Sequence, residues 1–130
     1  MGTAAEYAKC RKLVCVLKDA CTVIADETGK IYLNLSGNAG MATAGSGDVL
    51  AGLLASVCCM YLKQTSESAE ISDTDLCERD TVLCDQAALG VFLHGCGGDE
   101  AARKKGMHSM TARDICDGAG AILQTTGSKN

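Results

Sequence analysis

The 130-residue sequence contains no proline and no tryptophan, and its only aromatic side chains are three tyrosines and one phenylalanine. Proteins that stack nucleic-acid bases on aromatic side chains need more of them. The 12 lysines and arginines are outnumbered by 16 aspartates and glutamates, whereas binding to a phosphate backbone depends on clustered basic residues. We therefore expect no nucleic-acid partner.

Long apolar runs and paired cysteines are also missing. The longest apolar run, residues 49–62, is shorter than the roughly 20 residues of a membrane helix, and we expect no signal peptide. Nine cysteines occur, but their odd number and irregular spacing exclude a disulfide scaffold or a zinc site. We expect most of them to be small core residues in a reducing cytoplasm, with no membrane partner and no metal-ligating residues.

The remaining pattern alternates helical and extended segments. Helices are predicted over residues 3–12, 49–62, 80–95 and from a capping-box-like start at 111–114, strands over 13–17, 22–26 and 30–34, and a solvated connection over 63–80. A polar segment is expected after residue 95, and a frayed tail at 127–130. The fold class is α/β. Because three strands are few for these helices, residues 1–130 are predicted to form a single partial domain, the C-terminal portion of a larger one or a unit that pairs with a second copy as a homo-oligomer.

Residues 36–47 form a glycine-rich loop that opens the second helix. Such a loop offers free backbone N–H groups to an anion, and the hydroxyls of Thr43 and Ser46 add donors. The loop is not a P-loop, because Ser46-Gly47 stands where lysine and a hydroxyl residue belong. It is not a dinucleotide fingerprint either, because Leu50 replaces the third glycine.

Asp48 follows this loop directly, and two interpretations of it stay open. A carboxylate at a helix N-terminus is commonly an N-cap. Beside a phosphate-binding loop it can instead take the proton from a hydroxyl that attacks a nucleotide's terminal phosphate. The N–H groups of residues 45–48 then stabilise the charge on the transferred group.

The segment Asn34–Gly52, NLSGNAGMATAGSGDVLAG, closely resembles the signature of the ADP/ATP-dependent NAD(P)H-hydrate dehydratases, a branch of the ribokinase-like superfamily. Gly45–Asp48 resembles the anion hole and catalytic aspartate of the superfamily, and residues 37–43 resemble the dehydratase branch. Residues 16–26 and 87–99 extend the resemblance, which covers about residues 12–123. It implies a ribokinase-like, Rossmann-like three-layer fold, of which this chain is the C-terminal portion.

The resemblance also implies an activity and its residues. Members are lyases that repair hydrated NADH or NADPH: ADP or ATP, with Mg²⁺, phosphorylates the hydrate's hydroxyl, and phosphate then leaves. Asp48 is implied to contact the hydrate and act as the base. The implied nucleotide-binding residues are Lys18, Asp19, Ala20, Cys21, Thr22, Asn38, Ala39, Gly40, Met41, Ala42, Thr43, Ala44, Gly45, Ser46 and Gly47.

Two departures keep alternatives open. Asp19 stands where the family has glycine, and an acid beside a phosphate is unfavourable unless it points away or meets Mg²⁺. The N-terminal half of the family's domain has no counterpart here. A ribokinase-like kinase acting on a small hydroxylated metabolite is one alternative, and a non-catalytic association module is the other.

Overall fold

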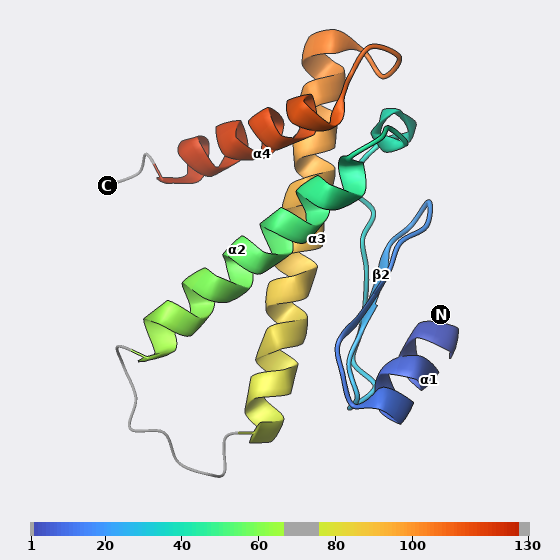
Figure 1. Cartoon of the computed structure of the whole chain (residues 1–130), viewed down its shortest axis with the longest axis vertical. Helices are drawn as coiled ribbons and strands as arrows, with labels where there is room; N and C mark the ends of the chain where they lie inside the picture. Colours follow the sequence, from blue (N-terminus) through green and yellow to red (C-terminus); the bar gives the residue numbers. More distant parts are fainter. Residues whose placement is uncertain (1, 67–75, 128–130) are drawn as a thin grey trace. The chain divides into compact units, whose positions relative to one another are not determined.

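The computed structural model describes residues 2–66 and 76–127 (Figure 1). The chain divides into two compact units. The first unit comprises Met1–Asn34 and Leu54–Leu89, and the second comprises Leu35–Leu53 and Gly90–Asn130. Helices α2 (Ser46–Ser66) and α3 (Leu76–Lys105) contribute residues to both units. That residues 1–130 form one partial domain stays a prediction.

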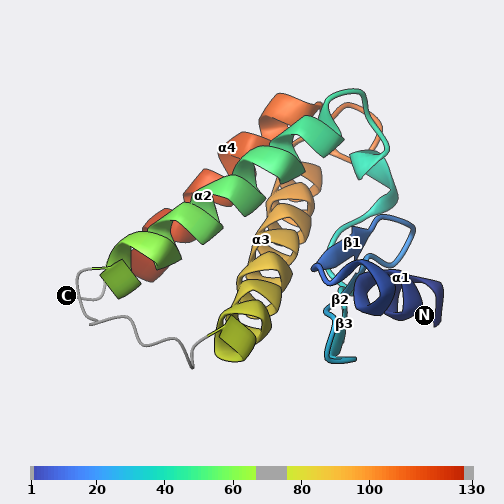
Figure 2. The ribbon, with the colours of Figure 1, turned by 60° about the horizontal axis from the view of Figure 1, so that its bottom comes forward.

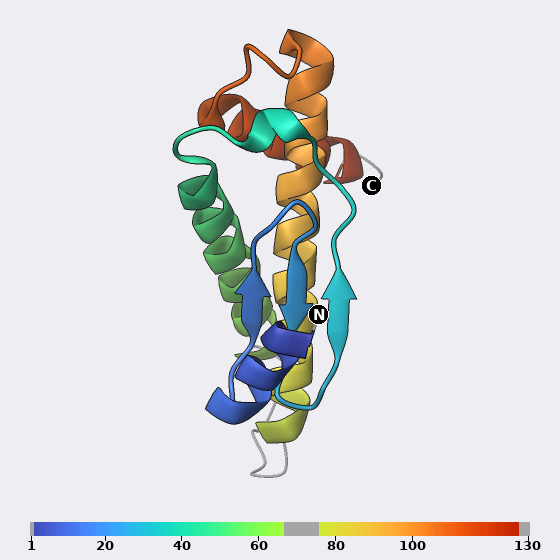
Figure 3. The same ribbon diagram turned by 90° about the vertical axis from the view of Figure 1, so that its right-hand side faces the viewer.

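The first unit contains a three-stranded antiparallel sheet, whose strands run in alternating directions in Figure 3. Helix α1 (Gly2–Arg11) is followed by β1 (Cys15–Leu17), β2 (Val23–Ala25) and β3 (Ile31–Leu33), in the order β1-β2-β3. The helix, the first strand and the hairpin predicted from the sequence are therefore confirmed, each strand being shorter than expected.

Helix α1 lies against one face of this sheet (Figure 2). Ala4 and Ala8 of the helix form a buried cluster with Val23 and Ala25 of β2. Alanine on the helix allows a close approach to the central strand, and Cys15 of β1 packs against the same cluster. Three apolar side chains of the two outer strands are exposed: Leu17, Ile31 and Leu33.

The turn between β2 and β3 is organised by a buried carboxylate. Asp26 is fully buried, and its Oδ1 accepts hydrogen bonds from Thr28 N (2.9 Å), Thr28 Oγ1 (2.7 Å) and Lys30 N (2.9 Å). The side chain thus satisfies backbone donors that the tight turn leaves without a strand partner. Gly29 closes this turn in the left-handed region, with φ +95°.

A second carboxylate joins β3 and its neighbouring turn to α3 within the same unit. Asp85 Oδ1 accepts from Tyr32 Oη at 2.6 Å and pairs with Lys30 Nζ. The Lys30 ammonium and the Tyr32 hydroxyl hold the pKa of Asp85 below its usual range. The adjacent Cys84 is fully buried, and this burial, followed by the charge of Asp26, raises the pKa of its thiol to about 11.

The helices depart from the sequence prediction at their ends. Helix α2 begins at Ser46, inside the predicted loop, and α3 continues to Lys105. The expectation that the third helix stops near residue 95 before a polar segment is therefore wrong. Of the predicted connection at 63–80, residues 63–66 belong to α2 and 76–80 to α3, while 67–75, like the tail from 128, lies outside the described residues.

Two glycines inside α3 account for this difference, because two other segments pack directly on the helix backbone at these positions. A Cβ at Gly95 would lie 2.8 Å from the main-chain carbon of Ser36. One at Gly97 would lie 2.8 Å from the main-chain nitrogen of Ala119 in α4 (Ala112–Gly127). The glycines thus mark close crossings rather than a helix end.

The start of α4 matches the predicted capping box. Asp114 Oδ2 accepts from Thr111 N and Thr111 Oγ1, both at 2.8 Å, and Asp114 Oδ1 pairs with Lys105 Nζ at 2.6 Å. The Lys105 ammonium, helped by Thr111, lowers the pKa of Asp114 to about 2. Ile115 and Ala119 of α4 are buried, and Ile122, which shares their helical spacing, is half-buried.

The cysteines are less buried than expected. The side chains of eight of them are described by the structure; all eight are free thiols, and Cys84 is the buried one among them. The prediction that most cysteines are core residues is therefore wrong for these eight.

Over Ser46–Gln64, α2 is long and apolar enough to cross a membrane by length and composition alone, a test that core helices also pass.

Candidate functional site

The loop that precedes α2 is tied to α3 within the second unit. Asp99 accepts a hydrogen bond from Gly37 N at 2.9 Å and from Asn38 Nδ2 at 3.0 Å. Asn38 Nδ2 also donates to the carbonyl of Gly98 at 3.0 Å. These contacts join residues about sixty positions apart in the sequence, so α3 fixes where the loop begins.

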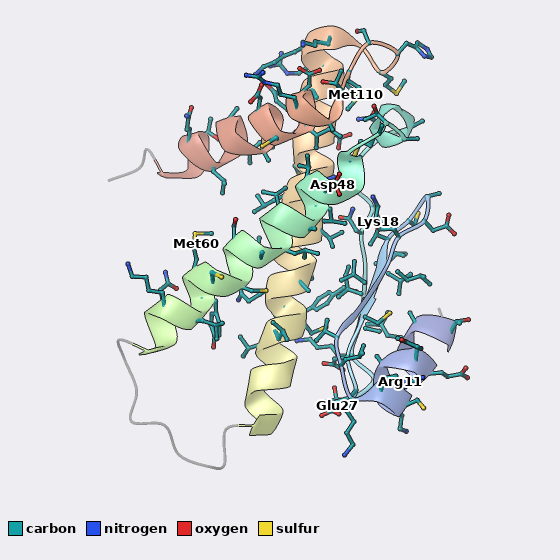
Figure 4. All side chains as sticks on the ribbon, viewed as in Figure 1. Arg11, Lys18, Glu27, Asp48, Met60 and Met110 are labelled. Atoms are coloured by element: carbon teal, nitrogen blue, oxygen red, sulfur yellow. The ribbon has the colours of Figure 1, made fainter. Side chains whose placement is uncertain are left out.

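A short 3₁₀ helix, η1 (Ala39–Met41), continues the loop. Asn38 caps it, because its Oδ1 accepts from Gly40 N at 3.0 Å. Gly40 packs against the connection between α3 and α4: a Cβ there would lie 2.5 Å from the Met107 carbonyl oxygen and from Met110 Sδ (Figure 4 labels Met110). The η1 turn is thus fixed both by the Asn38 cap and by the packing of Gly40 on the connection between α3 and α4.

The loop then turns sharply into α2. Gly45 has φ +84°, in the left-handed region that residues with a Cβ rarely adopt, and a Cβ there would also meet Ala112. Ser46 N donates to the carbonyl of Thr43 at 3.2 Å, which closes the turn. The sequence therefore needs glycine at this position for the backbone to enter the helix.

Two backbone donors remain at this helix start. Asp48 N and Val49 N both donate to the Gly45 carbonyl at 3.1 Å, and Ser46 N is used by Thr43. Within residues 2–66 and 76–127, no acceptor is found for the N–H groups of Gly45 and Gly47. The sequence predicts backbone N–H donors for an anion over residues 45–48. Of these donors, the N–H groups of Gly45 and Gly47 are the two without an acceptor, and they lie at the positive end of the α2 dipole.

Asp48 is exposed and is the third residue of α2 (Figure 4). The N-cap interpretation does not fit, because the helix has already begun at Ser46. A carboxylate in the first turn is stabilised by the helix dipole. Its exposure leaves it accessible to a hydroxyl-bearing substrate held beside the Gly45 and Gly47 donors.

His94 of α3 contacts the same turn, a relation that the sequence interpretation missed. Its Nε2 lies 2.9 Å from the Ser46 carbonyl oxygen and 3.4 Å from Ser46 Oγ, and both side chains are buried. The signal in the sequence was a histidine directly before Gly95, a glycine inside a helix, which indicates that another segment packs closely there.

The other predicted nucleotide-binding residues belong to the first unit. They lie in the connection between β1 and β2, where Lys18, Asp19, Ala20 and Cys21 are exposed and Thr22 is half-buried. Asp19 Oδ1 accepts from Ala20 N at 2.7 Å, so this carboxylate is engaged in its own turn. The predicted residues thus fall into two sets, 18–22 in one unit and 38–48 in the other.

A search of the described part of the chain for three or more His, Cys, Asp or Glu side chains able to share a metal ion finds no such group. Mg²⁺ usually keeps several waters and binds through one or two carboxylates together with substrate phosphates. The donor set of this chain fits an ion that arrives with a phosphate ligand, with Asp48 the carboxylate nearest the two glycine donors in the sequence.

These features fit an α/β protein of the ribokinase-like class, in which a glycine-rich loop leads directly into α2. Its fold is similar to that of the ADP/ATP-dependent NAD(P)H-hydrate dehydratase from Bacillus subtilis, solved with ATP/Mg²⁺, with a TM-score of 0.72 and 26% identity over 95% of this chain. The model of the NAD(P)H-hydrate dehydratase family matches residues 1–119. The chain belongs to this family.

Comparison with curated sequences supports the same family. The chain is 44% identical over 114 residues to the bifunctional NAD(P)H-hydrate repair enzyme Nnr of Moorella thermoacetica. It is 35% identical over 92 residues to the ADP-dependent (S)-NAD(P)H-hydrate dehydratase of Neisseria meningitidis. These matches cover 88% and 71% of this chain but 18% and 25% of the relatives, and 38% of the Bacillus subtilis protein. The chain therefore spans well under half the length of each.

Proposed function

We propose that this chain carries the phosphate-binding loop and the catalytic base of an ADP- or ATP-dependent NAD(P)H-hydrate dehydratase, a lyase. The observation that supports this most directly is the start of α2, where the Gly45 and Gly47 N–H groups have no acceptor among the described residues and Asp48 follows in the first turn. The family to which the chain belongs supports the choice of substrate.

In the proposed reaction, Asp48 takes the proton of the hydroxyl group of hydrated NADH or NADPH. The hydroxyl oxygen attacks the terminal phosphorus of ADP or ATP, and the bond to the bridging oxygen breaks, releasing a nucleotide shorter by one phosphate. The two glycine N–H groups hold the transferred phosphoryl group. Phosphate then leaves with the C–O bonding electrons while a neighbouring carbon loses a proton, which restores the dihydronicotinamide.

Residues 38–47 are proposed to surround the nucleotide phosphates, with Asn38 and Gly40 fixing the loop and Thr43 supporting its turn. Lys18 is proposed to act as a point charge near the phosphates, together with residues 19–22 of the same connection. Mg²⁺ is proposed to arrive with the nucleotide and to neutralise phosphate charge when it is bound.

The remaining parts of the proposal concern location and assembly. We place the chain in the cytoplasm, where its free thiols stay reduced. We also propose self-association, since Leu17, Ile31 and Leu33 are exposed beside α1. Light scattering over a range of protein concentrations tests this, and a concentration-independent mass equal to one chain would contradict it.

Calorimetric titration of the chain with ADP and with ATP, each with Mg²⁺, tests the phosphate site. Saturable binding supports the loop assignment, and no binding to the folded chain contradicts it. The hydrate-repair assay then tests the reaction, with Asp48→Asn and the matched control Asp117→Asn, an exposed aspartate of α4. We expect Asp48→Asn to bind nucleotide but not to turn over, and Asp117→Asn to match the parent. A stable phosphorylated product would instead favour the kinase alternative.

A further inference from the structure

We propose that His94 is a positioning residue for the anion site: by holding the Ser46 carbonyl, it sets the orientation of the Gly47 N–H. This inference rests on the proposed function of the α2 start as a phosphate site. The contact that carries it is the 2.9 Å distance between His94 Nε2 and the Ser46 carbonyl oxygen.

The link between the two groups is the peptide bond itself. Ser46 C=O and Gly47 N–H belong to one planar trans amide, in which the oxygen and the hydrogen point in opposite directions. When His94 donates its Nε2–H to the oxygen, the hydrogen of Gly47 is fixed on the opposite side. A neutral or a charged imidazole can make this bond, provided Nε2 carries a proton.

This peptide lies in the first turn of α2, and glycines stand on both sides of Ser46. Gly45 stands in the left-handed region at φ +84°, and Gly47 follows Ser46, so two of three consecutive residues lack a Cβ. Glycine populates both signs of φ readily, so this turn is less rigid than one of residues with side chains, and the His94 contact adds a restraint to the one that the helix provides. Catalysis by backbone donors depends on their being oriented before the charge appears.

His94 is itself well restrained within the second unit. Its side chain is 5% exposed, and the buried Ser46 that it holds is 4% exposed. The next residue, Gly95, packs on Ser36, and Asp99, one turn further along α3, accepts from Gly37 N. The same stretch of α3 thus fixes the beginning of the loop through Asp99 and its end through His94.

The test compares His94→Gln, which keeps an N–H donor, with His94→Leu, which does not. The first readout is the Gly47 amide in ¹H–¹⁵N NMR spectra of the ligand-free chain. We expect His94→Leu to shift or broaden this resonance and to speed its hydrogen exchange, and His94→Gln to restore it. An unchanged Gly47 amide in His94→Leu would overturn the proposal.

The second readout is nucleotide affinity, which we expect to fall about tenfold in His94→Leu and to recover in His94→Gln, a smaller effect than deleting a preorganised donor outright. Equal affinity in the parent and His94→Leu would also overturn the proposal. Failure of the parent to bind nucleotide contradicts the proposed function, whereas the Gly47 amide still decides the role of His94. If His94→Leu does not fold, a protected Nε2–H proton of His94 in the parent supports the proposal, and its rapid exchange refutes it.

Discussion

Two glycines of α4, Gly118 and Gly120, provide a matched test of the crossing between α3 and α4. A Cβ at Gly118 would press on the carbonyl group of Gly97, whose carbon would lie 3.0 Å away, whereas one at Gly120 would meet nothing within 4 Å. Replacing an interior helical glycine with alanine stabilises a helix by about 1 kcal/mol. Gly120→Ala should therefore raise the free energy of unfolding by up to about 1 kcal/mol.

Gly118→Ala gains the same helix propensity but adds overpacking, which typically destabilises a protein by about 1–3 kcal/mol. The upper part of that range applies, because the opposing atoms belong to a backbone that cannot change rotamer. We expect Gly118→Ala to unfold at lower urea than Gly120→Ala by the equivalent of about 2–3 kcal/mol. Urea unfolding followed by far-UV circular dichroism measures this difference. Equal midpoints for the two variants would refute the close crossing.

Three further predictions concern the carboxylates of Asp26 and Asp114 and the thiol of Cys84. Asp26→Ala should destabilise the chain by roughly 2–4 kcal/mol in urea unfolding, because it deletes three hydrogen bonds to a buried carboxylate, and a loss of a few tenths would contradict this. The lowered pKa of Asp114 beside Lys105 stabilises the folded state at pH values above about 3.8, and this contribution should fade as the pH falls towards 2. Asp114→Asn should lack this part of the pH dependence in acid titrations of stability, and an unchanged acid limb would count against the pairing. Because burial raises the pKa of Cys84 to about 11, iodoacetamide at neutral pH should label exposed Cys116 while leaving Cys84 intact, as mass spectrometry would show.

The sequence predicts local structure well where a single chemical pattern dominates. The hairpin at residues 22–34 follows from two β-rich runs around Gly29, and the start of α4 follows from Thr111 and Asp114. It fails where tertiary packing reverses a local preference. Gly95 and Gly97 disfavour a helix by roughly 1 kcal/mol each, yet α3 runs through them because the backbones that pack there leave no room for a side chain.

The candidate site shows the same division. Glycine spacing and the following carboxylate were sufficient to select residues 45–48 from the sequence. Which N–H groups remain available depends on hydrogen bonds made by the Thr43 and Gly45 carbonyls, and the sequence does not encode these visibly. His94 lies 48 residues from Ser46, so only the folded chain reveals that one holds the other.

The long reach of the contacts between the loop and α3 has a consequence for the order of events during synthesis. The hydrogen bond from Gly37 N to Asp99 cannot form until Asp99, 62 residues further along the chain, has been synthesised. At roughly 5–20 residues per second, a ribosome needs about 3–12 seconds to add that length. The glycine-rich turn is therefore translated before α3 but acquires its shape only after Asp99 of α3 has been added. A nascent chain shorter than this should contain the complete glycine motif and still lack a formed site.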